Sequence, residues 1–257
     1  MRQAARQSSI LEAVARLGRC SVAELARDLN VSDETIRRDL KLLADTGRVL
    51  KVHGGVVLPD VLRESAFEQR LRENAEAKKA IARLAAAQVQ NGDSLMLDTG
   101  STTAYVAYAL REHRDLMVVT NSIDIARALA TRNGNRVYMA GGELRADDGA
   151  ALGPTAAAYI TQFRVRLAIL SIGAIDANDG LMNFDFAESD YSRRVISRAE
   201  RTVIVADHSK FGRRALVTVV PFEEVHTLIT DRAPPEPFDR QLAQAGVEVL
   251  IAHDGED

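Results

Sequence analysis

Cysteine is nearly absent from this chain, and that scarcity narrows the possible folds. Cys20 is the single cysteine, so an intrachain disulfide and a cysteine-rich zinc site are both excluded. A chain of this kind fits a reducing compartment. At 257 residues it is still long enough to bury a sizeable core without covalent staples. We expect Cys20 to be a small core residue, and a redox switch is the alternative use of its thiol.

Long hydrophobic runs are absent as well. No stretch approaches the roughly 18–20 consecutive apolar residues that a membrane-spanning helix needs. The N-terminal segment MRQAARQSSILEAV is basic but lacks the unbroken apolar core of a signal peptide. The sequence therefore predicts a soluble cytoplasmic protein with no membrane partner.

A large excess of charge of either sign is the third thing missing, because the formal net charge is only −3. The charge is unevenly distributed, however. Residues 1–57 hold ten Lys/Arg and seven Asp/Glu, giving +3, so the remaining 200 residues carry −6. A weakly basic N-terminal segment is compatible with nucleic-acid binding, but so small an excess of positive charge is also common on surfaces that bind nothing.

Three helical patterns open the chain, over residues 5–17, 22–29 and 32–45. Ser21 with Glu24 three residues later forms a capping box at the start of the second. Ser32 is a favourable N-cap for the third. The two helices are separated by only a short turn, which is typical of a helix-turn-helix motif.

A hairpin is predicted after the third helix. Two β-prone runs within residues 48–58 flank Gly54-Gly55. Together with the helices, the hairpin predicts a winged helix-turn-helix domain over residues 1–58. The polar segment 59–74 is expected to be a partly helical linker.

The third helical pattern separates apolar from charged residues. Ile36, Leu40 and Leu43 lie within about 60° of one another on a helical wheel and form a core-facing stripe. The opposite side carries Glu34, Arg37, Arg38 and Lys41. Such a helix suits the major groove of DNA, where arginine bonds bidentately to guanine. A three-helix domain with a solvated charged face is the other interpretation, and these residues alone do not choose between the two.

From residue 75 onward, apolar strand patterns alternate with amphipathic helices. The expected strands cover residues 94–98, 116–120, 136–140, 167–172, 202–206, 227–230 and 247–251. Helices are expected over 75–90, from the first strand's loop to about Arg111, and over 123–131. This alternation predicts a second, larger α/β domain over residues 75–257, built on a mostly parallel sheet.

The second domain has no GxGxxG, Walker, HExxH or GxSxG motif, and we expect neither a cofactor nor a metal. Its first strand ends in Asp98-Thr-Gly-Ser-Thr-Thr103 and leads into a helix, which favours an anion such as phosphate. Other strand ends carry Thr120-Asn121-Ser122, Gly141-Gly142, Gly173 and Asp207-His-Ser-Lys-Phe-Gly212. Ligands of open α/β sheets bind outside these carboxyl ends, so the loops are expected to form one pocket, with Lys210 as a cation. Ordinary β–α turns and a surface lysine are the alternative.

One segment resembles a known family closely. SDETIRRDL over residues 32–40, followed by RVLKVHGG over 48–55, is similar to the DNA-reading signature of the DeoR family of bacterial regulators. The resemblance implies that Thr35, Arg37 and Arg38 lie in the DNA groove. Expected DNA contacts, including those of the wing, come from Ser21, Ser32, Glu34, Thr35, Arg37, Arg38, Lys41, Lys51 and His53.

The resemblance continues to about residue 252 through LDTGSTT, VVTNS, AGGELR, LGP, GAID, GL and DHSKFG, in the family's order. It implies a sensor domain that resembles ribose-5-phosphate isomerase and binds phosphorylated sugars or polyols. The implied ligand-binding residues are Asp98, Thr99, Gly100, Ser101, Thr102, Thr103, Asn121, Gly142, Asp176, Glu188 and Lys210. The chain has Gly173-Ala174 where many members have two glycines. AGGELRADDG, ITQFR, FDFAE and DHSKFGR look most like members that respond to glycerol 3-phosphate, which makes it the expected effector.

An enzyme is the competing hypothesis. Asp98, Asp176, Glu188, Asp207 and Lys210 could carry out proton abstraction in a phosphosugar isomerase. An isomerase has no need of a DNA-reading domain, so we expect this protein to be a repressor of a carbohydrate or glycerol catabolic operon, without catalytic residues. Operator DNA and effector would each lower the affinity for the other by the same factor. Because operators mirror two-fold symmetry, a homodimer or homotetramer is expected.

Overall fold

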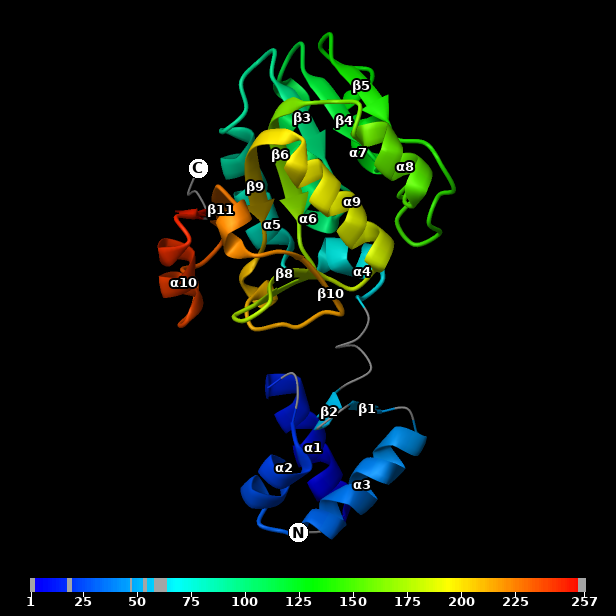
Figure 1. The fold of residues 1–257 in the computed structure, drawn as a ribbon, viewed down its shortest axis with the longest axis vertical. Helices are drawn as coiled ribbons and strands as arrows, with labels where there is room; N and C mark the ends of the chain where they lie inside the picture. The colour runs from blue at the N-terminus through cyan, green and yellow to red at the C-terminus, as the bar shows by residue number, and fades with distance from the viewer. Residues whose placement is uncertain (1–2, 18–19, 47, 53–54, 58–63, 254–257) are drawn as a thin grey trace. The chain divides into compact units, whose positions relative to one another are not determined.

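The computed structural model describes residues 3–17, 20–46, 48–52, 55–57 and 64–253 (Figure 1). Contacts divide the chain into two compact units. The first contains Met1–Glu64 and Arg213–Ala215, and the second contains Ser65–Gly212 and Leu216–Asp257. Among the described residues, none of the helices has the length and apolar character needed to cross a membrane.

The first unit is a three-helix bundle with a β-hairpin. It contains α1 (Gln3–Leu17), α2 (Val22–Asp28), α3 (Asp33–Asp45), β1 (Leu50–Val52) and β2 (Gly55–Val57). The two strands pair antiparallel, with Leu50 opposite Val57. Ile10, Leu25 and Ile36, one from each helix, are fully buried and centre the core. Cys20 is also buried there, as expected, and exchanges backbone hydrogen bonds of 2.9 and 3.1 Å with Val56. The winged helix-turn-helix fold is confirmed.

A seven-stranded sheet forms the centre of the second unit. Its strands, in spatial order, are β12 (Glu248–Ile251), β11 (Thr227–Thr230), β9 (Ala199–Val205), β6 (Val165–Ser171), β3 (Ser94–Leu97), β4 (Met117–Thr120) and β5 (Arg136–Met139). Every neighbouring pair is parallel. The predicted parallel α/β sheet is therefore confirmed. The chain order reverses between β3 and β6, which makes that pair the topological switch point.

Helices cover both faces of this sheet and create two separate cores (Figure 1). One face packs against α5 (Ala75–Ala86), α6 (Ser101–Ala109) and α7 (Ile123–Leu129); the other packs against α8 (Pro154–Ile160), α9 (Phe186–Ser197) and α10 (Phe238–Gln244). Successive strand residues point to opposite faces. Accordingly, Leu95 and Leu97 enter the first core and Met96 enters the second. Three 3₁₀ turns, Leu110–Glu112, His208–Lys210 and Phe222–Glu224, complete the connections.

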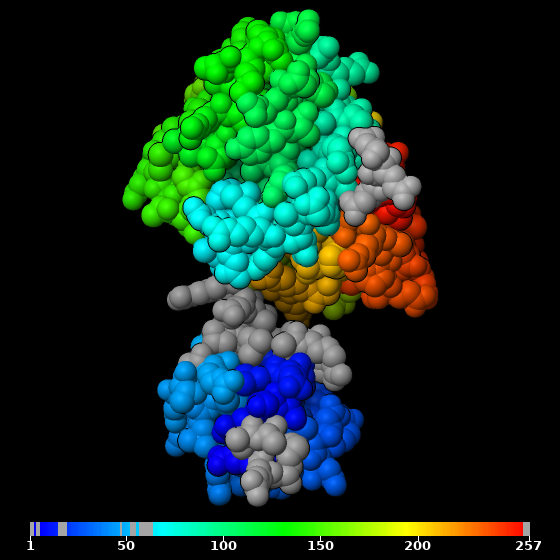
Figure 2. Space-filling view, turned by 180° about the vertical axis from the view of Figure 1, so that it is seen from behind, coloured from blue at the N-terminus to red at the C-terminus, as the bar shows by residue number. Residues whose placement is uncertain are grey.

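Two features of the second unit refine the sequence-based expectation: a small antiparallel sheet that it lacks, and a helix within the segment expected to be a partly helical linker. A small antiparallel sheet has the order β10 (Val217–Val220), β8 (Gly180–Asn183), β7 (Ala174–Asp176). Its strands have three or four residues each, and β7 and β8 are buried throughout, so they show no alternating pattern. The other is α4 (Phe67–Arg72), which falls within the expected linker segment and belongs by its contacts to the second unit. In Figure 2 it lies on the surface of that unit, in cyan.

Candidate DNA-binding surface and effector site

The outer face of α3 is charged, and its inner face is apolar. Ile36, Leu40 and Leu43 are buried, as the helical wheel predicts. The exposed residues of this helix include Glu34, Arg37, Arg38 and Lys41, while Thr35 is half-buried. The side chains on the exposed face are therefore available to base edges and phosphates in a DNA groove.

Ser21 and Ser32 have structural roles in addition to their expected DNA contacts. The Ser21 hydroxyl accepts a hydrogen bond from the Glu24 N–H at 3.2 Å, and the Glu24 carboxylate accepts one from the Ser21 N–H at 2.7 Å. The Ser32 hydroxyl accepts from the Thr35 N–H at 3.3 Å. Both serines thus satisfy N–H groups that a helix leaves unpaired at its start.

A surface hollow of about 590 Å³ brings residues of α2, α3 and the hairpin together. Its lining includes three of the expected DNA-binding residues, Ser21, Arg37 and Lys51. Arg37 and Lys51 give this hollow two cations, the charge that DNA phosphates attract. The remaining expected wing residue, His53, lies outside the described residues.

Asp39 is a structurally important residue that the sequence reasoning missed. It lies within the TIRRDL segment, yet only 1% of its side chain is exposed. Its carboxylate accepts a hydrogen bond from Arg6 Nε at 2.5 Å and one from Gln3 Nε2 at 3.3 Å, which joins α3 to α1. The detectable signal was an acidic residue on the core-facing side, beside Leu40, with Arg6 at a helical position upstream.

The candidate effector site begins at the switch point, where the loops after β3 and β6 touch. Asp98 Oδ1 accepts a hydrogen bond from the Ser171 N–H at 3.0 Å. Gly100 approaches the same serine so closely that a Cβ added to it would lie 1.8 Å from Ser171 Oγ. Glycine suits position 100 because the Ser171 side chain occupies the space that a Cβ would need.

Helix α6 starts directly from this loop. Gly100 is its N-cap and supplies no side-chain cap, and Ser101, Thr102 and Thr103 in the first turn are buried. The Thr103 hydroxyl donates to the Asp98 carbonyl at 2.9 Å and also lies 3.1 Å from the Gly100 carbonyl. The first N–H groups of a helix lack intrahelical acceptors and carry partial positive charge. A small anion is therefore the chemistry that suits this position.

A hydrogen-bond network extends from Thr99 to the loops after β4 and β5 and to helix α9. The Thr99 N–H donates to Asn121 Oδ1 at 3.0 Å, and the Thr99 hydroxyl donates to Asp148 Oδ2 at 3.3 Å. Arg145 bonds Asp148 through Nε at 2.9 Å and bonds Glu188 through Nη1 at 2.9 Å. Burial opposes ionisation of Asp148, but the Arg145 guanidinium outweighs that effect and lowers the pKa of the carboxyl. The structure thus brings Asn121 and Glu188 into one network with the Asp98–Thr103 loop.

Arg145 and Asp148 are the residues of this network that sequence reasoning missed. Both belong to the AGGELRADDG segment, where Gly142 was the only position selected. Gly142 is exposed and has a φ of 147°, three residues before Arg145. The missed signal was an Arg and an Asp spaced i, i+3 within a strand-end loop, which let the two side chains pair.

Asp176 and Lys210 occupy other parts of the carboxyl edge of the sheets. Asp176 accepts hydrogen bonds from the N–H groups of Asn178 and Asp179, which shapes the turn between β7 and β8. Lys210 is buried, and its charge acts together with that of Lys78 on Asp207. Desolvation lowers the pKa of Lys78 to about 8 in spite of the Asp207 charge. Lys78 was not selected from the sequence, because nothing local marks a helical lysine as buried.

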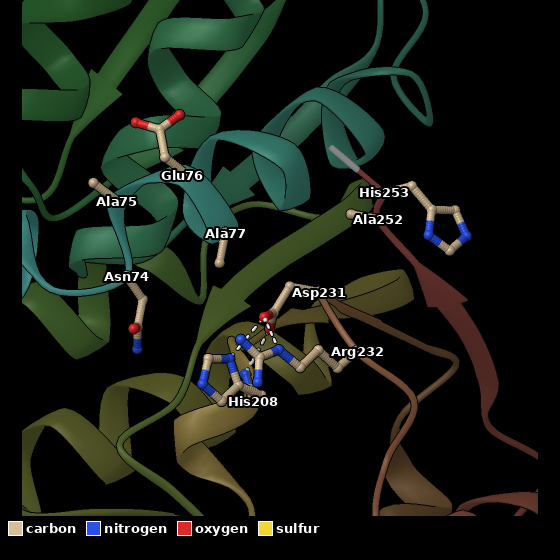
Figure 3. Close-up of a pocket in the computed structure, with 9 residues that line it drawn as sticks. All are labelled: Asn74, Ala75, Glu76, Ala77, His208, Asp231, Arg232, Ala252 and His253. Carbon is tan, nitrogen blue, oxygen red and sulfur yellow. Dashed lines mark hydrogen bonds and ion pairs between the residues drawn. The ribbon is translucent and has the colours of Figure 1, made fainter. Parts of the chain in front are cut away.

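A cavity of about 410 Å³ lies at the carboxyl ends of β9, β11 and β12, against the start of α5 (Figure 3). Figure 3 shows His208, Asp231 and Arg232 pointing toward one another, whereas Glu76 points away. His208 Nδ1 lies 2.7 Å from Asp231 Oδ2. Within the described part of the chain, its lining includes none of the residues expected to bind the effector. The residues of the Thr99 network, rather than this cavity, are therefore the candidate site.

Over the described ranges, no group of three or more His, Cys, Asp or Glu side chains is positioned to hold a metal ion.

Two family models match the chain: the DeoR-like helix-turn-helix domain over residues 6–61 and the DeoR C-terminal sensor domain over residues 73–232. With the fold described above, these matches define a DNA-binding transcription regulator with a small-molecule sensor domain, rather than an enzyme.

Similar proteins cover nearly the whole chain. The glycerol-3-phosphate regulon repressor of Escherichia coli is 39% identical over 91% of this chain and 93% of its own length. The HTH-type transcriptional repressor CsqR of the same organism is 33% identical over 96% of this chain and 94% of its own. The protein belongs to the DeoR family of transcription regulators. Among solved structures, ribose 5-phosphate isomerase from Plasmodium falciparum matches with a TM-score of 0.38 and 20% identity, over 52% of each chain.

Proposed function

We propose that this protein represses a glycerol or carbohydrate catabolic operon and leaves its operator when a phosphorylated sugar or polyol binds its sensor domain. Glycerol 3-phosphate is the proposed effector. The observation that carries the proposal is the 39% identity with a glycerol-3-phosphate regulon repressor, because a match over 91% of the chain is too long to be confined to one domain. A DNA-bound regulator of this kind acts in the cytoplasm.

In this proposal, α3 reads the operator from the major groove. Arg37 and Arg38 are exposed on its outer face and can bond to guanine, while Lys51 of the hairpin approaches the phosphates. The full proposed contact set is Ser21, Ser32, Glu34, Thr35, Arg37, Arg38, Lys41, Lys51 and His53. Two such units on a two-fold symmetric operator require a homodimer or homotetramer, joined through the larger unit.

The effector is proposed to bind at the switch point, with its phosphate at the start of α6. The N–H groups of Ser101 and Thr102 and the closely packed Gly100 suit an anion, and Lys210 supplies a positive charge. Polar groups of Asn121 and Glu188 lie in the network that begins at Thr99 and would accept or donate to hydroxyls. The other proposed ligand residues are Asp98, Thr103, Gly142 and Asp176.

The first test is fluorescence anisotropy with DNA from upstream of the protein's own gene. The DNA titration is repeated at several salt concentrations and with glycerol 3-phosphate, fructose 1-phosphate and other sugar phosphates. We expect tight, salt-sensitive binding that glycerol 3-phosphate weakens by about 5–150-fold, the range typical of allosteric coupling. Release by a different sugar phosphate would correct the effector, and binding that no phosphate alters would overturn the proposed ligand class.

Lys210→Ala sharpens this test because it should affect effector binding without affecting DNA binding. The variant should bind the operator like the wild type and lose its response to the effector. Lys79→Ala, at an exposed position of α5, is the matched control and should respond normally. An unchanged response in Lys210→Ala would remove Lys210 from the proposed site.

A further inference from the structure

Helix α4 is the first element of the larger unit after the DNA-binding unit, and three groups from the candidate effector region hold it. The Asp147 carboxylate accepts hydrogen bonds from the Phe67 N–H, at 3.2 and 3.1 Å, and lies 3.8 Å from Arg70 Nη2. Asp147 thereby caps the start of α4, which has no side-chain cap of its own from Ala66. A residue of a distant segment therefore holds the start of α4.

The neighbouring carboxylate, that of Asp148, bonds to the candidate effector site instead of to α4. It accepts from the Thr99 hydroxyl at 3.3 Å and from Arg145 at 2.9 Å, and its side chain is fully buried. Two consecutive residues therefore bind different structures: Asp148 binds the effector-site network and Asp147 binds α4. Asp147 and Asp148 are consecutive residues of one loop, so a backbone displacement at Asp148 also moves Asp147.

Two further attachments come from helix α6 and from the loop after β9, and a lysine of α5 adds another. Tyr105 of α6 donates its hydroxyl to the Leu71 carbonyl at 2.9 Å. Asn74, directly after α4, donates to Asp207 Oδ1 at 3.0 Å. Lys78 donates to the carbonyls of Arg70 and Glu73 at the far end of α4. Residues of the loops after β5 and β9 and of helices α5 and α6 therefore bond to the α4 region.

We propose that α4 transmits effector occupancy from the sensor site to the DNA-binding unit, with Asp147 and Tyr105 as its positioning residues. This inference rests on the proposed function. An effector hydroxyl that bonds to Thr99 or Asp148 competes with the bond between them, shifts the loop that carries Asp147, and changes how α4 is held. In the sequence α4 is the first described element after the DNA-binding unit, and in this proposal the same change alters the DNA-binding equilibrium.

The test compares three affinities in the full-length protein. Calorimetry measures the Kd of glycerol 3-phosphate, and anisotropy measures the Kd of the operator without and with saturating glycerol 3-phosphate. In Asp147→Ala, both separate affinities should stay within about twofold of the wild type, while the ratio of the two operator Kd values falls at least about threefold toward one. Glu143→Ala, an exposed acidic residue of the same loop, is the control and should keep the wild-type ratio.

A conservative pair of variants guards against a folding defect in Asp147→Ala. Tyr105→Phe removes only the hydroxyl that bonds Leu71, and Tyr108→Phe removes a hydroxyl from an exposed position of the same helix. We expect the ratio to fall in Tyr105→Phe and to be unchanged in Tyr108→Phe. Hydrogen–deuterium exchange of residues 67–72 gives an independent readout: glycerol 3-phosphate should change it in the wild type but not in Asp147→Ala.

The outcomes separate the two levels of the proposal. A wild-type protein that no sugar phosphate releases from the operator would defeat the proposed function itself. A responsive wild type with unchanged ratios in both Asp147→Ala and Tyr105→Phe would overturn the role of α4 and leave the function intact. Equal exchange of residues 67–72 with and without glycerol 3-phosphate in a responsive wild type would overturn it as well.

Discussion

Helices α3 and α6 both begin with a run of polar residues, yet the two runs have opposite surroundings. The start of α3 is exposed and capped by its own Ser32, and charged side chains cover the outer face of that helix. The start of α6 is buried, has glycine as its N-cap, and touches residues from distant segments. In the proposed function, the first arrangement presents side chains to DNA and the second surrounds a small effector. Burial would then give similar residue types different functions.

The two helices also differ in how far along the chain their partners lie. Asp39 of α3 is joined to Arg6, 33 residues away and within the same small unit. The loop before α6 is joined to Ser171, 73 residues after Asp98, and Thr99 reaches Asp148, 49 residues later. The DNA-binding surface is therefore built from one local segment, and the effector site is assembled by the sheet.

The largest effect is expected from removing both arginines on the outer face of α3. Arg37→Ala/Arg38→Ala should lose specific operator binding, a loss of at least about 10³-fold, because specific sites are bound by that factor or more over random DNA. Its sensor domain should bind glycerol 3-phosphate normally. Anisotropy and calorimetry measure the two affinities. The control Arg83→Ala/Arg127→Ala removes two exposed arginines from the larger unit, and retained operator affinity in the α3 variant would remove α3 from the interface.

The next effect is on stability and concerns the inner face of the same helix. Asp39→Ala leaves Arg6 without its buried partner and should destabilise the first unit by about 3–5 kcal/mol. Thermal unfolding of the full protein, followed by a probe in each unit, should show the first unit melting early and the second unchanged. Asp45→Ala, an exposed aspartate at the end of α3, is the matched control. Equal stability of the two variants would show that the Arg6–Asp39 pair contributes little.

The smallest of the three effects concerns the close contact at the start of α6. Gly100→Ala adds a methyl group 1.8 Å from Ser171 Oγ, and such overpacking should cost about 1–3 kcal/mol in the stability of the second unit. Effector affinity should fall with it. Ser171→Gly in the same chain removes the clash and should restore stability. Gly141→Ala, where a new Cβ meets nothing within 4 Å, is the control. A stable Gly100→Ala protein with full effector affinity would contradict the proposed site.

Sequence reasoning succeeded where a pattern repeats over neighbouring residues. The three N-terminal helices follow from their apolar spacing and serine caps, and the seven parallel strands follow from short apolar runs. It failed where the role of a strand or side chain depends on contacts with distant parts of the chain. Fully buried β7 and β8 carry no alternation. Asp39 and Lys78 resemble ordinary surface charges until the fold buries them, and Arg145 does so until the fold pairs it with Asp148. Asp147 and Asp148 are indistinguishable in sequence, although one lies against α4 and the other against Thr99.

The bond between Asp98 and Ser171 also bears on the synthesis of this protein. The core of the first unit is complete once Val56 has left the ribosome, whereas the central pair of strands must wait for a segment far downstream. Domains near the N-terminus fold first during translation, and sheets built from distant parallel strands fold slowly. The DNA reader is thus mature while its sensor is still being made. A chain that stops early would be a DNA-binding protein without a means of release.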